Sequence, residues 1–238
     1  MHKKSLLLLI VIMNLVSTSI SSKVPESARS KKVISRVSSP LAQALKLQGL
    51  ELGSPVYFRV FKQESTLEAW VQETNTDKFK LFKTYPICTF SGKLGPKLKE
   101  GDLQSPEGFY FVKPNQMNPN SRFHLSFNLG FPNAYDRYHQ RTGSALMIHG
   151  NCVSIGCYTM TDPLIEEIYI LADAALNKGQ PFFRVHAFPF RMSQENMKRY
   201  KNNQWFSFWE NLKEGYDYFE KNKFPPNTEN NQGSYIFN

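Results

Sequence analysis

The chain has 238 residues, 41% of them hydrophobic, and a formal net charge of +9. This length holds one substantial domain with additions, and this hydrophobic content supports a buried core, which excludes a chain that is disordered throughout. A single short apolar run excludes a bundle of membrane-spanning helices. The basic charge favours an anionic polymer or a membrane surface as a partner.

Residues 1–21 are predicted to be a secretory signal peptide. Two lysines precede a short apolar run from Ser5 to Val16, and small residues follow it as far as Ser22. A basic start, a short apolar centre and small residues at the end are typical of export signals, whereas the run is short for a membrane span. An uncleaved anchor is the alternative. Cleavage would lower the charge from +9 to +7, because the segment carries two lysines and no acid. Export to the periplasm or cell envelope argues against a nucleic-acid partner, for which no motif is present.

The segment that follows is interpreted in two parts. Residues 22–39 are rich in Ser, Lys and Arg, with few large apolar side chains, which predicts a flexible basic linker. For residues 40–52, the preceding Ser39 is a candidate N-cap, Pro40 a first helical residue and Gly49 a stop. A short helix is therefore expected before the main domain.

The central part of the chain is predicted to be α+β and predominantly β. Strand patterns cover residues 56–61, 67–72, 79–90, 109–112, 123–129, 144–148 and 182–188. The first three are expected to form a meander. Asp162 and Pro163 predict the start of a helix that ends at Gly179. The regions 91–108 and 133–143 are expected to be surface loops beside a site.

The C-terminal section has a different pattern. Ser193 is expected to cap a helix over residues 194–201, and a stripe of apolar side chains follows at helical spacing: Trp205, Trp209, Leu212, Tyr216 and Phe219. This stripe predicts a helical extension over residues 191–226 with an inward packing face. Residues 227–238 are rich in Asn and are expected to be a disordered tail.

His149 and Cys157 form the candidate catalytic pair. They lie eight residues apart, and Gly150 and Gly156 would let the chain fold back between them. A thiolate attacks carbonyl carbon, and a neighbouring imidazolium stabilises it. Backbone N–H groups of Gly156 and Cys157 would hold the oxyanion. The alternative interpretation is that both side chains are ordinary core residues.

The other cysteines leave a question open. Cys88, Cys152 and Cys157 cannot all pair within one chain. A bridge between Cys88 and Cys152 would leave Cys157 as the free thiol, although both could also be reduced.

Ile148-His149-Gly150 and Ser154-Ile155-Gly156-Cys157 resemble the signature of the L,D-transpeptidase catalytic domain (YkuD) family, and Gly156 to Asp162 resembles its YafK-type branch. The resemblance extends from about Gly53 to Phe219 and includes residues 95–98, 105–110, 117–121 and 125–137. It implies a catalytic domain over residues 53–190. Where many members have Ser-His-Gly-Cys and then an arginine two residues on, this chain has Ile155 and Thr159.

By this resemblance, the enzyme acts on peptidoglycan stem peptides without a cofactor. Cys157 attacks the carbonyl at the L-centre of the third residue, His149 serves as base, and the Gly150 carbonyl orients the imidazole. An acceptor amine resolves the thioester, which gives a cross-link. The alternative is hydrolysis that releases a wall-linked lipoprotein, and an alternative of another class is a non-catalytic module that binds wall peptides.

Further candidates carry less support. The substrate-binding candidates are Tyr158, Ser154, Arg137 and Asn128. Arginine grips carboxylate in bidentate fashion, although Asp136 with an arginine could equally hold the shape of its own loop. His186 and His139 are rival bases. A metal site from His149, Cys152, Cys157 and His186 lacks the spacing of a common zinc motif.

Overall fold

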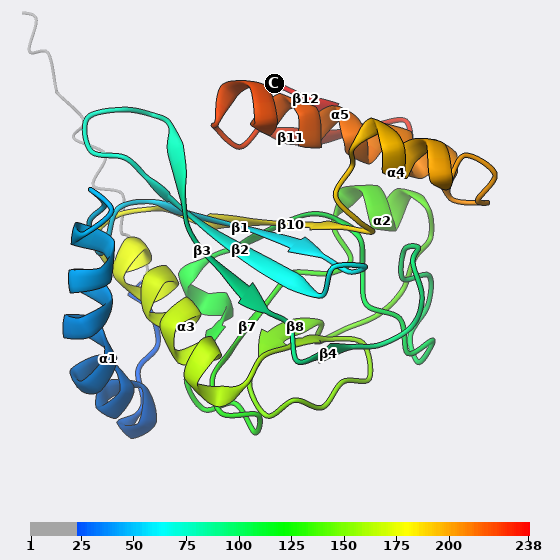
Figure 1. Ribbon diagram of the computed structural model, residues 1–238. Helices are drawn as coiled ribbons and strands as arrows, with labels where there is room; N and C mark the ends of the chain where they lie inside the picture. The colour runs from blue at the N-terminus through cyan, green and yellow to red at the C-terminus, as the bar shows by residue number, and fades with distance from the viewer. Residues whose placement is uncertain (1–22) are drawn as a thin grey trace, which may run out of the picture.

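The computed structural model describes residues 23–238, so the predicted signal peptide lies outside the described residues. Two five-stranded sheets form the centre of the molecule, and helices cover them on both sides (Figure 1). The first sheet has the order β3-β2-β1-β10-β5. Its strands are β1 (Val56–Phe61), β2 (Thr66–Gln72), β3 (Phe79–Pro86), β5 (Gly108–Val112) and β10 (Phe183–Phe188).

The second sheet is smaller and carries the candidate histidine. Its order is β4-β9-β8-β7-β6. These strands are β4 (Thr89–Phe90), β6 (Met117–Asn118), β7 (Ser126–Asn128), β8 (Met147–His149) and β9 (Tyr158–Thr159), and the 3-10 turn η1 (Pro114–Gln116) precedes β6. The α+β class is confirmed, and so is the meander, because β1 pairs with β2 and β2 with β3, both antiparallel. The single strand predicted over 79–90 is two strands, one in each sheet.

The first sheet is buried on both faces. Every residue of β1 is buried, and alternate residues face different clusters. Phe58 and Val60 point into the main core between the sheets, whereas Tyr57 and Phe61 point to the opposite side. A strand covered on both faces has no polar face to expose, which explains why β1 is apolar except for Arg59, whose charge is paired with Glu68 and Glu220.

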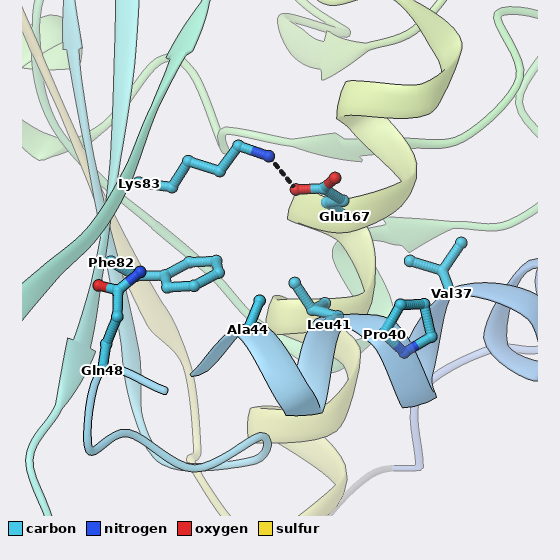
Figure 2. A pocket seen from close by; sticks show the side chains of 8 residues that line it. All are labelled: Val37, Pro40, Leu41, Ala44, Gln48, Phe82, Lys83 and Glu167. Carbon is cyan, nitrogen blue, oxygen red and sulfur yellow. Dashed lines mark hydrogen bonds and ion pairs between the residues drawn. The ribbon is translucent and has the colours of Figure 1, made fainter. Parts of the chain in front are cut away.

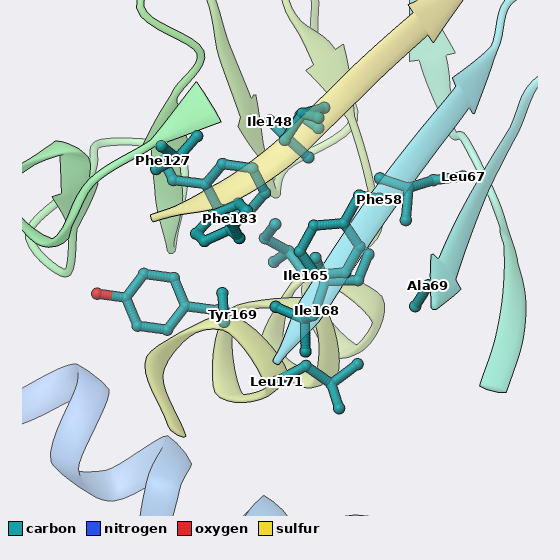
Figure 3. Close-up of a cluster of buried hydrophobic side chains, with 14 of the residues drawn as sticks. Phe58, Leu67, Ala69, Phe127, Ile148, Ile165, Ile168, Tyr169, Leu171 and Phe183 are labelled. Carbon is teal, nitrogen blue, oxygen red and sulfur yellow. The ribbon is translucent and has the colours of Figure 1, made fainter. Parts of the chain in front are cut away.

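Helix α3 (Asp162–Asn177) fills the main core directly after the candidate cysteine. Figure 3 shows Ile165 and Ile168 of α3 against Phe58 of the first sheet and Phe127 of the second. The cap differs from the prediction, since Thr161 is the N-cap residue and Asp162 is the first helical residue. Asp162 Oδ1 instead accepts a hydrogen bond from the Asn151 N–H at 2.9 Å, which ties α3 to the turn after His149.

The prediction of a flexible linker over residues 22–39 is wrong, because α1 runs continuously from Ala28 to Lys46. Pro40 lies inside this helix rather than at its start. Val33, Leu41 and Leu45 are buried at helical spacing, so the exposed basic residues of the helix form only its outer face. Figure 2 shows Val37, Leu41 and Ala44 of α1 around a small hollow of about 250 Å³, with the Lys83–Glu167 ion pair at its edge.

A capping box begins α1. The Ser27 side chain accepts from the Ser30 N–H, and the Ser30 side chain accepts from the Ser27 N–H. We expect Ser27→Ala to lower the free energy of unfolding by about 1 kcal/mol, because an N-cap hydroxyl pairs backbone N–H groups that the helix cannot pair. Urea unfolding measures this. Ser35→Ala at an exposed position of the same helix is the control, and equal stability of the two variants would contradict a capped helix here.

The C-terminal helices cover the other face of the first sheet. Helices α4 (Gln194–Arg199) and α5 (Phe206–Asn222) lie above it in Figure 1, while α1 and α3 lie below. Ser193 caps α4 as predicted. The inward aromatic stripe is also confirmed, because Trp209, Leu212 and Phe219 are buried.

The predicted disordered tail is wrong. Residues after 226 form a hairpin of β11 (Thr228–Asn231) and β12 (Ser234–Phe237). Tyr235 is buried against Phe109 and stacks on Tyr135 with ring centroids 4.2 Å apart. Two aromatic side chains therefore anchor a segment whose Asn-rich composition indicated disorder.

A fully buried ion pair fixes the loop before β5. Lys62 Nζ lies 3.1 Å from Glu107 Oε1 and donates to the carbonyls of Gly95 and Ser105. Glu107 also accepts from the Trp209 indole N–H at 2.9 Å. These bonds connect β1, the loop over residues 91–108 and α5. No helix within residues 23–238 is long and apolar enough to cross a membrane.

Candidate active site

His149 and Cys157 both line a groove of about 770 Å³, called the Cys157 groove below. The end of β8 and the turn over residues 153–157 form its floor. The loop from Lys97 to Leu103 contributes one wall, as predicted for the region 91–108, and residues 118–123 contribute another. No residue of the predicted loop 133–143 is among the groove's lining residues, and part of it is the short helix α2 (Ala134–Tyr138).

The His149 ring is fixed from two sides. Its Nδ1 lies 2.6 Å from the carbonyl oxygen of Gly150. A carbonyl oxygen only accepts, so Nδ1 carries the proton and Nε2 keeps its lone pair. The Phe123 ring stacks on the imidazole, with centroids 4.5 Å apart and planes 25° apart. The side chain is therefore held as the tautomer that can take a proton at Nε2.

Burial determines the charge of this imidazole. Loss of hydration lowers the pKa of His149, and the hydrogen bond to Gly150 only partly opposes that effect. The ring is consequently neutral at neutral pH.

Cys157 is the free cysteine of the chain, because Cys88 and Cys152 form a disulfide. The Cys157 sulfur accepts from the Met147 N–H at 3.4 Å and lies 3.7 Å from the Ala145 carbonyl, to which the thiol can donate. Burial raises the pKa of the thiol, while the Met147 N–H and the Lys97 ammonium act in the opposite direction. Both members of the pair are thus neutral before substrate binds.

Two serine hydroxyls hold the backbone at the cysteine. Ser154 Oγ and Ser105 Oγ donate to the Cys157 carbonyl at 2.7 and 3.1 Å. Ser154 Oγ also accepts from the Gly156 N–H at 3.2 Å, so this amide is already engaged and does not face an oxyanion as predicted. The Cys157 N–H has no hydrogen-bond partner within residues 23–238 and is the available donor.

At Gly150 and Gly156 the structure leaves no room, or no relaxed backbone conformation, for a larger residue. A Cβ on Gly150 would lie 2.5 Å from Asp162 Oδ1, and Gly156 has a φ of +147°. The turn between them also contains Cys152, whose bond to Cys88 tethers it to the end of β3. Larger residues at either glycine would displace the turn that carries the sulfur.

The structure separates the four substrate-binding candidates. Ser154 lines the Cys157 groove. Tyr158 is fully buried and its hydroxyl donates to the Pro106 carbonyl, so the predicted substrate contact is wrong. Asn128 accepts from the Gly130 N–H with its side chain and does not line the groove.

Arg137 is also outside the groove, contrary to the prediction. It donates to the Pro132 carbonyl and borders a separate hollow of about 500 Å³. Its neighbour Asp136 instead pairs with Arg141 at 2.8 Å, and both are buried. This pair therefore fits the alternative interpretation, in which Asp136 and an arginine hold the shape of their own loop.

The rival bases are excluded by position. His186 lies in β10 of the first sheet, fully buried, with Nδ1 2.7 Å from the Tyr57 hydroxyl. His139 Nε2 lies 2.9 Å from the Gly233 carbonyl in the C-terminal hairpin. Of the four residues considered for a metal site, Cys152 is in the disulfide and His186 is in the first sheet, and no cluster of three His, Cys, Asp or Glu side chains suited to a metal occurs in the described part of the chain.

Three charged residues of the groove were missed by sequence reasoning. Lys97 is buried in the wall, whereas Glu100 and Arg122 are exposed. Lys97 belongs to the segment Gly95 to Leu98 that carries the family resemblance, but none of the three stands in a motif with a known chemistry. Only the folded structure shows that these charged residues line the Cys157 groove.

Comparisons with known proteins identify the family of this chain. The model of the family described as "L,D-transpeptidase catalytic domain" (YkuD) matches residues 56–185. The protein YafK of Escherichia coli (strain K12), provisionally named an L,D-transpeptidase, is 50% identical over 185 residues, which are 78% of this chain and 74% of that protein. Its counterpart in Escherichia coli O157:H7 has the same identity and coverage.

Solved structures are more distant. The helical cell shape determining protein Pgp2 from Campylobacter jejuni is 19% identical with a TM-score of 0.45, over 76% of this chain and 64% of that one. Bd1075 of Bdellovibrio bacteriovorus is 20% identical with a TM-score of 0.41, over 72% of this chain and 61% of that one. The chain therefore spans less than two thirds of these structures.

Proposed function

This chain belongs to the L,D-transpeptidase catalytic domain family, and on that premise we propose that it acylates Cys157 with peptidoglycan stem peptides, using His149 as the base. The observation that carries the proposal is the fixed tautomer of His149. Its Nδ1–H is committed to the Gly150 carbonyl, so the basic Nε2 is available in the groove that holds the free thiol.

The first half of the reaction forms a thioester. Nε2 of His149 takes the thiol proton as the sulfur bonds to the carbonyl carbon at the L-centre of the third residue. The Cys157 N–H donates to the oxyanion. Collapse of the tetrahedral adduct breaks the bond to the leaving amine, which receives the proton from the imidazolium.

The two neutral resting groups fit this sequence of events. A buried ion pair would be costly before substrate arrives, and burial disfavours charge on both the sulfur and the ring. The thiol proton then moves to His149 only after substrate is bound, and the ionised sulfur attacks directly. This differs from the stable thiolate–imidazolium pair that the sequence suggested.

The second half of the reaction decides the biological outcome. An acceptor amine that attacks the thioester gives a cross-link, and water gives a free carboxyl group. Hydrolysis that releases a wall-linked lipoprotein uses the same residues and is the alternative outcome. The apolar, solvent-exposed side chains of Leu103 and Ile155 at the groove support a peptide substrate that lies along them.

The expected location is the periplasm or cell envelope, where wall peptides occur. The two N-terminal lysines, the apolar run at residues 5–16 and the small residues after it support export. The anionic wall or a membrane surface is the partner that the basic charge of the chain favours, and no role in cell shape is needed for the proposal.

Incubation of the mature protein with wall sacculi, followed by mass spectrometry of the muropeptides, tests the activity. New cross-links between third residues indicate transfer, and loss of lipoprotein remnants indicates hydrolysis. Unchanged muropeptides, together with no acyl adduct on Cys157, would leave only the non-catalytic binding module.

A further inference from the structure

Lys97 is a buried lysine in the wall of the Cys157 groove. Its side chain is only 3% exposed. The ammonium lies 2.5 Å from Asp102 Oδ1 and donates to the Lys99 carbonyl at 3.0 Å. Gly143 leaves room for the stem, because a Cβ at that position would lie 2.7 Å from Lys97 Cε. The charge is therefore held in one place.

The two members of the Lys97–Asp102 pair are not equivalent with respect to the groove. Lys97 lines it together with Cys157, whereas Asp102 does not. The Asp102 carboxylate also accepts backbone N–H groups from Leu98, Lys99 and Gln104, which spread its negative charge over the loop. Lys97 is thus the member of the pair that lines the groove together with Cys157.

The chemistry of Cys157 leaves a need for such a charge. When His149 takes the proton, negative charge appears on a sulfur that is half-buried. The charged or titratable groups that line the groove besides Cys157 are His149, Lys97, Glu100 and Arg122. Glu100 and Arg122 are exposed, so solvent screens them, and His149 is neutral until it takes the proton.

We propose that Lys97 is a positioning residue of the reaction, whose fixed positive charge stabilises the anionic sulfur of Cys157. Lys97 does not give up a proton and forms no bond to substrate. The proton moves from sulfur to His149 Nε2, and Lys97 acts only through its field. This inference rests on the proposed role of Cys157 as the nucleophile.

The test follows alkylation of Cys157 by iodoacetamide as a function of pH in the folded, non-reduced protein. Cys157 alone reacts, because the other two cysteines are in the disulfide. Since burial raises the pKa of Cys157, the wild-type rate should still be rising at a pH where a free cysteine has reached its plateau. We expect Lys97→Met to move the midpoint further upward and to slow alkylation about tenfold near neutral pH, with the plateau at high pH unchanged.

Asp102→Asn is the matched variant with the opposite sign. Removal of the carboxylate leaves the Lys97 charge uncompensated, so the midpoint should move downward. Lys97→Arg keeps the positive charge and should restore a midpoint near that of the wild type. Circular dichroism and thermal unfolding establish that each variant is folded.

The results separate a charge effect from a structural one. An unchanged midpoint in Lys97→Met, or shifts of the same sign in Lys97→Met and Asp102→Asn, would overturn the proposal. If Lys97→Met does not fold, Asp102→Asn and Lys97→Arg provide the test. A pH midpoint of alkylation that rises in Asp102→Asn would also overturn the proposal. Alkylation needs no wall substrate, so these outcomes are independent of a failure to acylate Cys157 with stem peptides.

Discussion

Replacement of Cys157 by alanine is expected to abolish the covalent adduct that the wild-type protein forms with a carbapenem. The adduct is an acyl group on sulfur, and no other free thiol exists in the chain to receive it. Turnover of wall peptides should fall by about a thousandfold or more, as when a nucleophile is removed from other acyl-transfer enzymes. Intact-protein mass spectrometry measures the adduct.

A matched pair of histidine variants accompanies this experiment. His149→Gln should slow adduct formation strongly, because the group that accepts the thiol proton is lost. His139→Gln should leave the rate unchanged, since His139 contacts the C-terminal hairpin outside the groove. Persistence of the adduct in Cys157→Ala, or equal rates in the two histidine variants, would contradict the assignment of the pair.

Removal of the disulfide, by the double substitution Cys88→Ser and Cys152→Ser, should lower the free energy of unfolding by about 4 kcal/mol. The bridge closes a loop with a sequence separation of 64 residues, and its loss returns that conformational freedom to the unfolded chain. Urea unfolding of the oxidised wild type and the double variant measures the difference.

The same variant should acylate more slowly while it remains folded. Cys152 lies in the turn between His149 and Cys157, where Asn151 and Cys152 both have positive φ values of 65° and 44°. The bridge holds this turn against the end of β3. The reduced wild-type protein is the control and should match the double variant in stability. Equal stability of the oxidised wild type and the double variant would show that the bridge does not constrain the fold.

Local patterns in the sequence were sufficient for the family, the α+β class and most strands. The family prediction is confirmed by a match over residues 56–185. The inward stripe of α5 was readable because its apolar side chains repeat at helical spacing, and the strand at residues 56–61 was readable as a short, largely apolar run rich in β-branched and aromatic residues. The His149 and Cys157 candidates came from the same kind of local signal, although their catalytic roles stay a prediction.

Composition gave the wrong prediction for segments whose packing partners lie far away in the sequence. Residues 23–39 looked like a linker, yet Val24 and Val33 are buried in the core shared with α3. The C-terminal tail looked disordered, yet Tyr235 is buried against Phe109, more than a hundred residues earlier. In both segments a few apolar contacts outweigh a polar average, and composition does not record where those contacts lie.

The sequence by itself determined which residues can do chemistry: a thiol, an imidazole and the glycines that let a turn form between them. The tertiary structure decided which groups share a site with them. It joined Cys88 to Cys152, brought Lys97 and Phe123 into the groove, and placed Tyr158, Asn128, Arg137 and His186 elsewhere. The reason is physical: nucleophilicity and basicity belong to a side chain, whereas its charge, tautomer and neighbours are set by burial and by contacts between distant parts of the chain.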